Sequence, residues 1–166
     1  MRSPRPVPDP VAPGKESVWD YPRPPRLEPC ARRLRVVSGD VVLADTRRGF
    51  RVLETSHPPS YYLPPDDCDM ARFVRAEGSS FCEWKGRAEY WDVRTDTAVV
   101  HGAAWSYPAP TAAFEAIRDH IACHPAAFDC FVDDEAVRPQ PGGFYGGWVT
   151  SDIGGPIKGP PGTEWW

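Results

Sequence analysis

Proline restricts the fold of this chain more than any other residue type, because it fixes φ and removes a backbone hydrogen-bond donor. The sequence has 21 prolines in 166 residues, and nine of them fall within residues 1–29. Because a sheet ladder needs the donor that proline lacks, we expect residues 1–29 to be extended or disordered. Within this stretch we predict a disordered proline-rich arm over residues 1–16, followed by a single β-rich domain over residues 17–166.

Composition and charge narrow the class of protein. Hydrophobic residues make up 41% of the chain and charged residues 25%, the usual balance of a soluble globular domain. The net charge of −4 and the isoelectric point near 5.5 argue against a nucleic-acid partner. No apolar run approaches the roughly 18–20 residues of a membrane span, and the first residues lack the apolar core of a signal peptide. We therefore expect a cytoplasmic protein with no membrane partner, whose five scattered cysteines are free thiols.

From residue 32 onward the hydrophobic pattern is typical of short β-strands separated by turn residues. Hairpin turns are predicted at Ser38-Gly39-Asp40, near Lys85-Gly86 and at Asp133-Asp134-Glu135. The predicted strands cover residues 34–37, 41–44, 50–54, 60–63, 81–84, 88–93, 97–100, 103–107, 128–132 and 136–137.

A single stretch, from Thr111 to about Cys123, has the pattern of an α-helix. Thr111 can cap its N-terminus, and Phe114, Ile117 and Ile121 fall on one helical face. Pro125 ends the helix, because proline disfavours helical backbone in the residue before it, here His124. The sequence pattern therefore predicts a mainly β domain with one α-helix at about 111–123.

Two kinds of chemistry find little support in the motifs. Structural zinc usually takes paired Cys or His ligands at short spacing, and the best cluster here, His120, Cys123 and His124, lacks further ligands at a recognisable spacing. Two-metal phosphoryl transfer needs carboxylates around paired ions, but here Asp67 and Asp69 precede the glycine-serine pair rather than follow it. We expect neither a metal nor a cofactor.

The most informative constellation combines two separate segments, residues 54–62 and 81–86. A lysine beside a carboxylate and an aromatic wall can bind an anion or act as an acid or base when partly desolvated. Strand alternation would place Phe81, Glu83 and Lys85 on one face, and Cys82 and Trp84 on the other. The alternative without a function is an exposed Glu–Lys ion pair on the surface, which contributes less than about 1 kcal/mol to stability.

From these segments we expect a pocket for a small anionic or carbonyl ligand. In it Lys85 would hold the ligand, Glu54 would orient Lys85 or move a proton, and Cys82 could be a nucleophile if His57 lay nearby as its base. The candidate catalytic residues are Lys85, Glu54 and Cys82, and the candidate ligand-binding residues are His57, Tyr62, Trp84, Trp105 and Tyr107.

A second functional class remains open, namely a protein-interaction module. Its contact surface would be an aromatic groove, with the proline-rich arm or the glycine-aromatic tail at residues 141–148 as the contact element.

Several of these segments together resemble a bacterial protein family, the domain of unknown function 427 family. The matching residues are Glu54-Thr55-Ser56-His57-Pro58-Pro59-Ser60-Tyr61-Tyr62-Leu63-Pro64, Phe81-Cys82-Glu83-Trp84-Lys85-Gly86 with Ala88-Glu89-Tyr90, Ala104-Trp105-Ser106-Tyr107-Pro108, and Gly143-Phe144-Tyr145-Gly146-Gly147-Trp148. The resemblance implies a compact two-sheet fold similar to the β-tent class. Other members of that class often bind zinc or a small ligand in a cleft between two sheets. The zinc does not carry over, because this sequence has no Cys-x-x-Cys. A nucleotidyltransferase label attached to the family has no motif support here.

Overall fold

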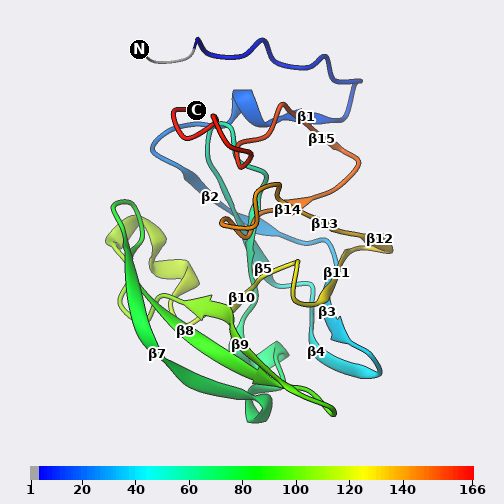
Figure 1. The fold of residues 1–166 in the computed structure, drawn as a ribbon, viewed down its shortest axis with the longest axis vertical. Coiled ribbons are helices and arrows are strands. Elements are labelled where there is room, and N and C mark those ends of the chain that lie inside the picture. Colours follow the sequence, from blue (N-terminus) through cyan, green and yellow to red (C-terminus); the bar gives the residue numbers. More distant parts are fainter. Residues whose placement is uncertain (1–3) are drawn as a thin grey trace.

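The computed structural model describes residues 4–166 and is mainly β, as predicted (Figure 1). Its strands are short and belong to several small sheets, and its helical segments within the described residues are 3-10 turns. No helix in residues 4–166 is long and apolar enough to cross a membrane.

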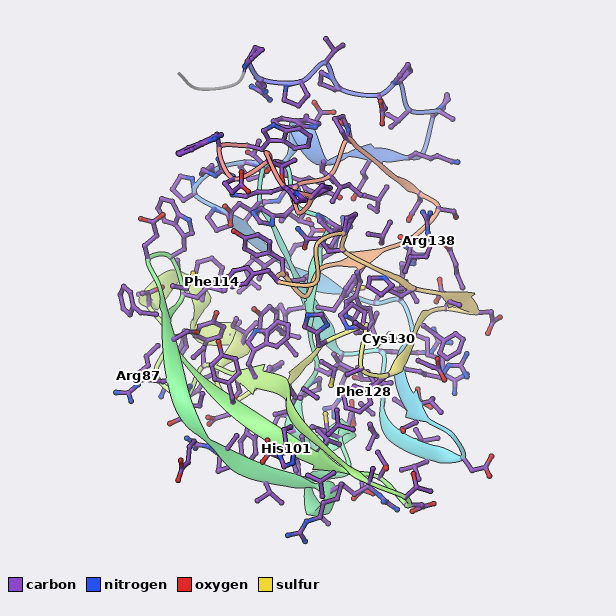
Figure 2. All side chains as sticks on the ribbon, in the orientation of Figure 1. Arg87, His101, Phe114, Phe128, Cys130 and Arg138 are labelled. Atoms are coloured by element: carbon purple, nitrogen blue, oxygen red, sulfur yellow. The ribbon has the colours of Figure 1, made fainter. Side chains whose placement is uncertain are left out.

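The first large sheet is antiparallel and has the order β10-β9-β8-β7. It contains β7 (Phe73–Cys82), β8 (Gly86–Arg94), β9 (Val99–Ser106) and β10 (Ala122–Cys123). The long β7–β8 hairpin, drawn in green in Figure 1, turns at residues 83–85, where the sequence predicted a turn. Figure 2 shows Arg87 on this hairpin pointing away from the body of the protein, in agreement with its exposure.

A three-stranded antiparallel sheet has the order β2-β5-β6. It contains β2 (Arg26–Cys30), β5 (Gly49–Leu53) and β6 (Ser60–Tyr62). Residues 26–30, within the stretch expected to be extended or disordered, form the extended strand β2, in which Pro29 pairs in register with Phe50. Proline is tolerated there because β2 is an edge strand, so the missing donor faces away from the ladder.

The remaining four-stranded sheet has the order β12-β11-β3-β4. It contains β3 (Leu34–Ser38), β4 (Val41–Thr46), β11 (Asp129–Val132) and β12 (Glu135–Ala136). The two predicted hairpins in this sheet are confirmed, and Gly39 takes a positive φ of 57° in the β3–β4 turn. Side chains from this sheet and from the first sheet form the largest hydrophobic core, to which Phe128 and Cys130 contribute (Figure 2).

The first and last segments of residues 4–166 lie at the same end of the molecule (Figure 1). Strands β1 (Glu16–Ser17) and β15 (Ile153–Gly154) form a parallel pair there. Strands β13 (Arg138–Pro139) and β14 (Trp148–Val149) form a second, antiparallel pair. The short η1 (Val18–Asp20) follows β1.

Of the predicted disordered arm, residues 1–3 lie outside the described residues, and residues 4–15 carry no strand or helix. The Asp9 amide donates to the Gly155 carbonyl at 2.8 Å.

The predicted α-helix at 111–123 is wrong. The segment instead forms η4 (Ala112–Ile117), a 3-10 helix with a kink at Phe114, and then β10. The three apolar residues of the predicted helical face are buried, but Phe114 and Ile117 pack in one core and Ile121 in another. Ile121 exchanges backbone hydrogen bonds with Leu63, at 2.8 Å in each direction.

Two further 3-10 turns, η2 (Pro65–Asp67) and η3 (Met70–Arg72), connect β6 to β7. They bring Asp67 and Asp69 to two different arginines. Arg48 pairs with Asp67 at 2.9 Å, and Arg72 pairs with Asp69 at 3.1 Å, so these carboxylates are occupied in separate surface ion pairs.

Candidate ligand-binding cleft

A cavity of about 590 Å³ lies between the β2-β5-β6 sheet and the β7–β10 sheet. One wall comes from β5, β6 and the loop between them, and the other comes from β7, β8 and β9. The glycine-aromatic segment at residues 143–146 and Lys158 complete the lining. The cleft therefore joins chain segments separated by about a hundred residues.

The structure brings seven of the eight predicted site residues to this cleft and leaves one outside. The seven that line it are Glu54, His57, Tyr62, Cys82, Lys85, Trp105 and Tyr107. Trp84 does not line the cleft. It packs against the core cluster behind it, and its carbonyl accepts a hydrogen bond from the Thr111 hydroxyl at 2.6 Å.

The predicted alternation of side chains over residues 81–85 is wrong, because Cys82 and Lys85 both line the cleft. Strand β7 ends at Cys82, and residues 83–85 form the hairpin turn. Alternation holds only while the backbone stays extended. The turn therefore returns Lys85 to the same side as Cys82.

Lys85 supplies a positive charge to the cleft. Its side chain is partly buried, and its Nζ lies 5.6 Å from the centre of the Tyr107 ring. Among residues 4–166 no carboxylate lies within 4 Å of this ammonium. Burial lowers the pKa of Lys85, but the combined effect of Tyr62, Cys82 and Glu54 raises it by more, so the pKa lies above its usual value. The side chain is protonated at neutral pH, which suits it for holding an anion rather than for attack as a neutral amine.

Glu54 was expected to orient Lys85, but it pairs with a different residue. Arg23 places two guanidinium nitrogens, Nε and Nη2, 3.2 Å from the Glu54 Oε2. The His57 Nε2 lies 3.8 Å from the same oxygen. The Glu54 carboxylate thus already has a cationic partner at the rim of the cleft.

The buried side chain of Gln140 orients His57. The Gln140 Oε1 accepts a hydrogen bond from the Gly147 amide at 3.2 Å, and this identifies the other end of the side chain as the NH₂ donor. Its Nε2 donates to the Lys158 carbonyl at 2.8 Å and to the His57 Nδ1 at 3.3 Å. His57 therefore accepts at Nδ1 and carries its proton at Nε2, on the side of Glu54.

The environment of His57 also keeps it neutral. Burial lowers its pKa to about 3, with further lowering from the positive charges of Lys158, Arg23 and Lys85. The Tyr145 ring packs edge-on against the imidazole, with 4.9 Å between ring centroids. In this tautomer His57 is a hydrogen-bond donor, and no hydrogen bond joins it to Cys82 among the described residues.

Aromatic side chains form the apolar wall of the cleft. The Trp105 indole donates to the Tyr62 hydroxyl at 3.4 Å, and the Tyr62 and Tyr107 rings lie 6.2 Å apart. Burial and the neighbouring Tyr62 raise the pKa of Tyr107, so its hydroxyl stays protonated. The wall presents apolar rings and neutral hydroxyl groups to a ligand.

Sequence reasoning missed four residues that shape the site: Arg23, Gln140, Tyr145 and Lys158. Tyr145 belongs to the glycine-aromatic tail that we considered only as an interaction surface. Gln140 lies between two prolines, and no motif marks it as a buried polar residue. Neither Arg23 nor Lys158 is close in sequence to the other site residues.

The residues considered for zinc do not form a metal site. Without the helix, His120 and His124 lose their one-turn spacing, and Cys123 is buried in the core. Over residues 4–166 no group of three or more His, Cys, Asp or Glu is arranged to hold a metal ion.

The chain belongs to the family described as a domain of unknown function (DUF427), whose model matches residues 26–134. This range contains the seven predicted residues that line the cleft. It does not contain Gln140, Tyr145 or Lys158, which complete the cleft from the C-terminal side. A comparison with curated proteins gives no match.

Proposed function

We propose that the cleft binds a small anionic organic molecule. The observation that carries this proposal is the Lys85 ammonium, which lines the cleft, stays protonated and has no carboxylate within 4 Å among the described residues. A partly buried cation without an ionic partner costs free energy unless a ligand supplies the opposite charge.

The size and lining of the cavity support a small-molecule ligand. A volume of about 590 Å³ lies within the usual range of roughly 300–1,000 Å³ for ligand pockets. Such pockets combine apolar walls with a few convergent polar groups. Here Trp105, Tyr62 and Tyr107 provide the wall, and Lys85 and the His57 Nε2–H provide the polar contacts.

In this proposal each residue has a distinct role. Lys85 holds the anionic or carbonyl group of the ligand, and the His57 Nε2–H donates a second hydrogen bond. Glu54 is neutralised by its ion pair with Arg23 and forms part of the rim of the site. Cys82 lines the cleft beside Lys85, where a ligand with an electrophilic carbon would meet its thiol. We further place the protein in the cytoplasm, because its cysteines are free thiols.

A second candidate function is contact with another protein at the mouth of the cleft. Phe81 and Phe144, which line the cleft, are 79% and 82% exposed. Exposed aromatic residues of this kind favour a binding surface. The arm is less available for such contact, because its Asp9 amide donates to the Gly155 carbonyl and because Trp19 and Tyr21, which follow the arm, are buried in a core cluster of this same chain.

The test is a thermal-shift screen against organic carboxylates, phosphates and sulfates, run on the wild type, Lys85→Met and Lys15→Met. Lys15 is exposed and distant in sequence, so Lys15→Met is the control for loss of one positive charge. A ligand at about 100 times its Kd stabilises by about 2.7 kcal/mol, which raises Tm by about 5–10 °C for a domain of this size. We expect such a shift in the wild type and in Lys15→Met, and its loss in Lys85→Met. No shift with any anion, or an undiminished shift in Lys85→Met, would refute the proposal and favour the protein-contact alternative.

A further inference from the structure

A second lysine, Lys158, lines the same cleft from the C-terminal segment. Its Nζ lies 5.5 Å from the centre of the Tyr145 ring and donates one hydrogen bond to the Trp166 carbonyl at 3.3 Å. An ammonium has three donors, so donors remain for a ligand. Its oxygen partner belongs to the main chain of Trp166, the last residue described, and no Asp or Glu carboxylate of residues 4–166 lies within 4 Å of the Lys158 ammonium.

The Gln140 side chain ties Lys158 to His57. Its single NH₂ group donates both to the Lys158 carbonyl and to the His57 Nδ1, so these two residues lie on either side of one buried amide. His57 also experiences the charge of Lys85 from the other wall. The positive charges of two lysines from different chain segments therefore act on the imidazole.

The charges that line the cleft do not balance. Glu54 is the carboxylate among the lining residues, and Arg23 already neutralises it at 3.2 Å. His57 and His124 are the remaining basic side chains of the lining, and burial lowers the pKa of both. Burial and the charge of Arg23 lower the pKa of Lys158, and Glu54 and Glu164 offset only part of this lowering. Two ammonium groups thus face the cleft of a protein whose net charge is −4.

The cleft also contains serine and tyrosine hydroxyl groups, which can donate or accept, but its two lysines and His57 present donors. Lys85 and Lys158 can only donate, and Gln140 fixes His57 with a proton at Nε2, which lies 3.8 Å from the Glu54 Oε2 and makes no hydrogen bond to it. The acceptor oxygens of Glu54 are engaged with Arg23. A ligand that complements these groups has acceptor oxygens without protons, which is the property of a fully ionised oxyanion.

We infer that the ligand of the cleft is a small organic dianion with an apolar or aromatic body, either a phosphate monoester or a dicarboxylate. This inference rests on the proposed function, because it specifies the charge of the anion that the same cleft binds. Lys85 supplies the first counter-charge and Lys158 the second, and the His57 Nε2–H donates between them.

Isothermal titration calorimetry at pH 8 and low salt tests the inference with two matched pairs of compounds. Phenyl phosphate is a dianion at this pH, because its second pKa is near 6, and phenyl sulfate is a monoanion of nearly the same shape. Phenylsuccinate and 4-phenylbutyrate form the corresponding dicarboxylate and monocarboxylate pair. We expect the dianion of at least one pair to bind about tenfold more tightly than its monoanion. A preference in the first pair alone identifies a phosphate monoester, and one in the second pair alone identifies a dicarboxylate.

Variants at Lys158 assign the second charge. Lys158→Gln should bring the dianion to within about twofold of the monoanion while leaving the monoanion affinity nearly unchanged, and Lys158→Arg should retain most of the preference. Lys85→Met should weaken both members of a pair. Equal binding of dianion and monoanion in both pairs, or a preference that survives Lys158→Gln, would overturn the dianion inference and leave the proposed anion site intact. Absence of binding by all four compounds, together with a blank thermal-shift screen, would overturn both.

Discussion

Gln140→Leu should destabilise the protein even though leucine is close in size to glutamine and the position is buried. Gln140 is only 2% exposed, and its amide joins three parts of the chain: the loop at Gly147, the carbonyl of Lys158 and the ring of His57. Leucine fills the space but makes none of these hydrogen bonds.

The expected loss follows from the three hydrogen bonds. A typical net contribution is about 1 kcal/mol per bond, and the Gly147 N–H is left buried without a partner. The gain from burying an apolar side chain offsets part of this loss. We therefore expect the free energy of unfolding to fall by about 3 kcal/mol, which corresponds to a decrease in Tm of about 6–12 °C for a domain of this size.

Urea denaturation of the wild type and of Gln140→Leu measures this loss directly. A matched variant, Gln140→Glu, isolates the effect on His57, because its carboxylate can accept from the Gly147 amide but cannot donate to His57. Nitrogen chemical shifts of the His57 ring should show a proton at Nε2 in the wild type and a proton at Nδ1 in Gln140→Glu. A loss below about 1 kcal/mol in Gln140→Leu, or an unchanged tautomer in Gln140→Glu, would refute the proposed role of Gln140.

Two other predictions concern pH and backbone geometry. The pKa of His57 is lowered from 6.5 to about 3, so below pH 6.5 the unfolded chain binds a proton that the folded protein does not, and stability is lost as the pH falls towards 3. Between pH 7.5 and 4.5 the wild type should lose about 2–3 kcal/mol more than His57→Gln in denaturant titrations, and parallel losses would contradict the lowered pKa. A Cβ at Gly159 would lie 1.8 Å from the Pro141 carbonyl oxygen, whereas one at Gly162 would meet no atom within 4 Å, and both residues have positive φ. Gly159→Ala should therefore cost at least about 2 kcal/mol more than Gly162→Ala in urea denaturation, and equal costs would show that the 141–159 contact is absent in solution.

The sequence predicted the local elements well where hairpins govern the structure. The β3–β4, β7–β8 and β11–β12 hairpins form at the predicted turns, because turn residues and alternating apolar residues act over only a few positions. The two segments expected to build a pocket, residues 54–62 and 81–86, do meet across the cleft. Their meeting could be suspected from the concentration of polar groups among aromatics, but the pairing of Glu54 with Arg23 could not.

The failures of the sequence-based prediction have a common physical cause. The apolar spacing of Phe114, Ile117 and Ile121 indicated burial correctly, but the same spacing cannot distinguish a helix from a 3-10 turn followed by a strand. A helix of this length is marginal in isolation, so the backbone partners offered by Leu63 and β9 decided the conformation.

What the sequence determined by itself is therefore a β-rich chain, its hairpins and seven of the residues that line its cleft. The tertiary structure decided how the cleft is closed and which charges remain unpaired within it. Gln140 and Lys158 reach the site only because the C-terminal segment folds back over it, and hydrogen bonds between residues separated by more than 80 positions leave no local pattern in the sequence.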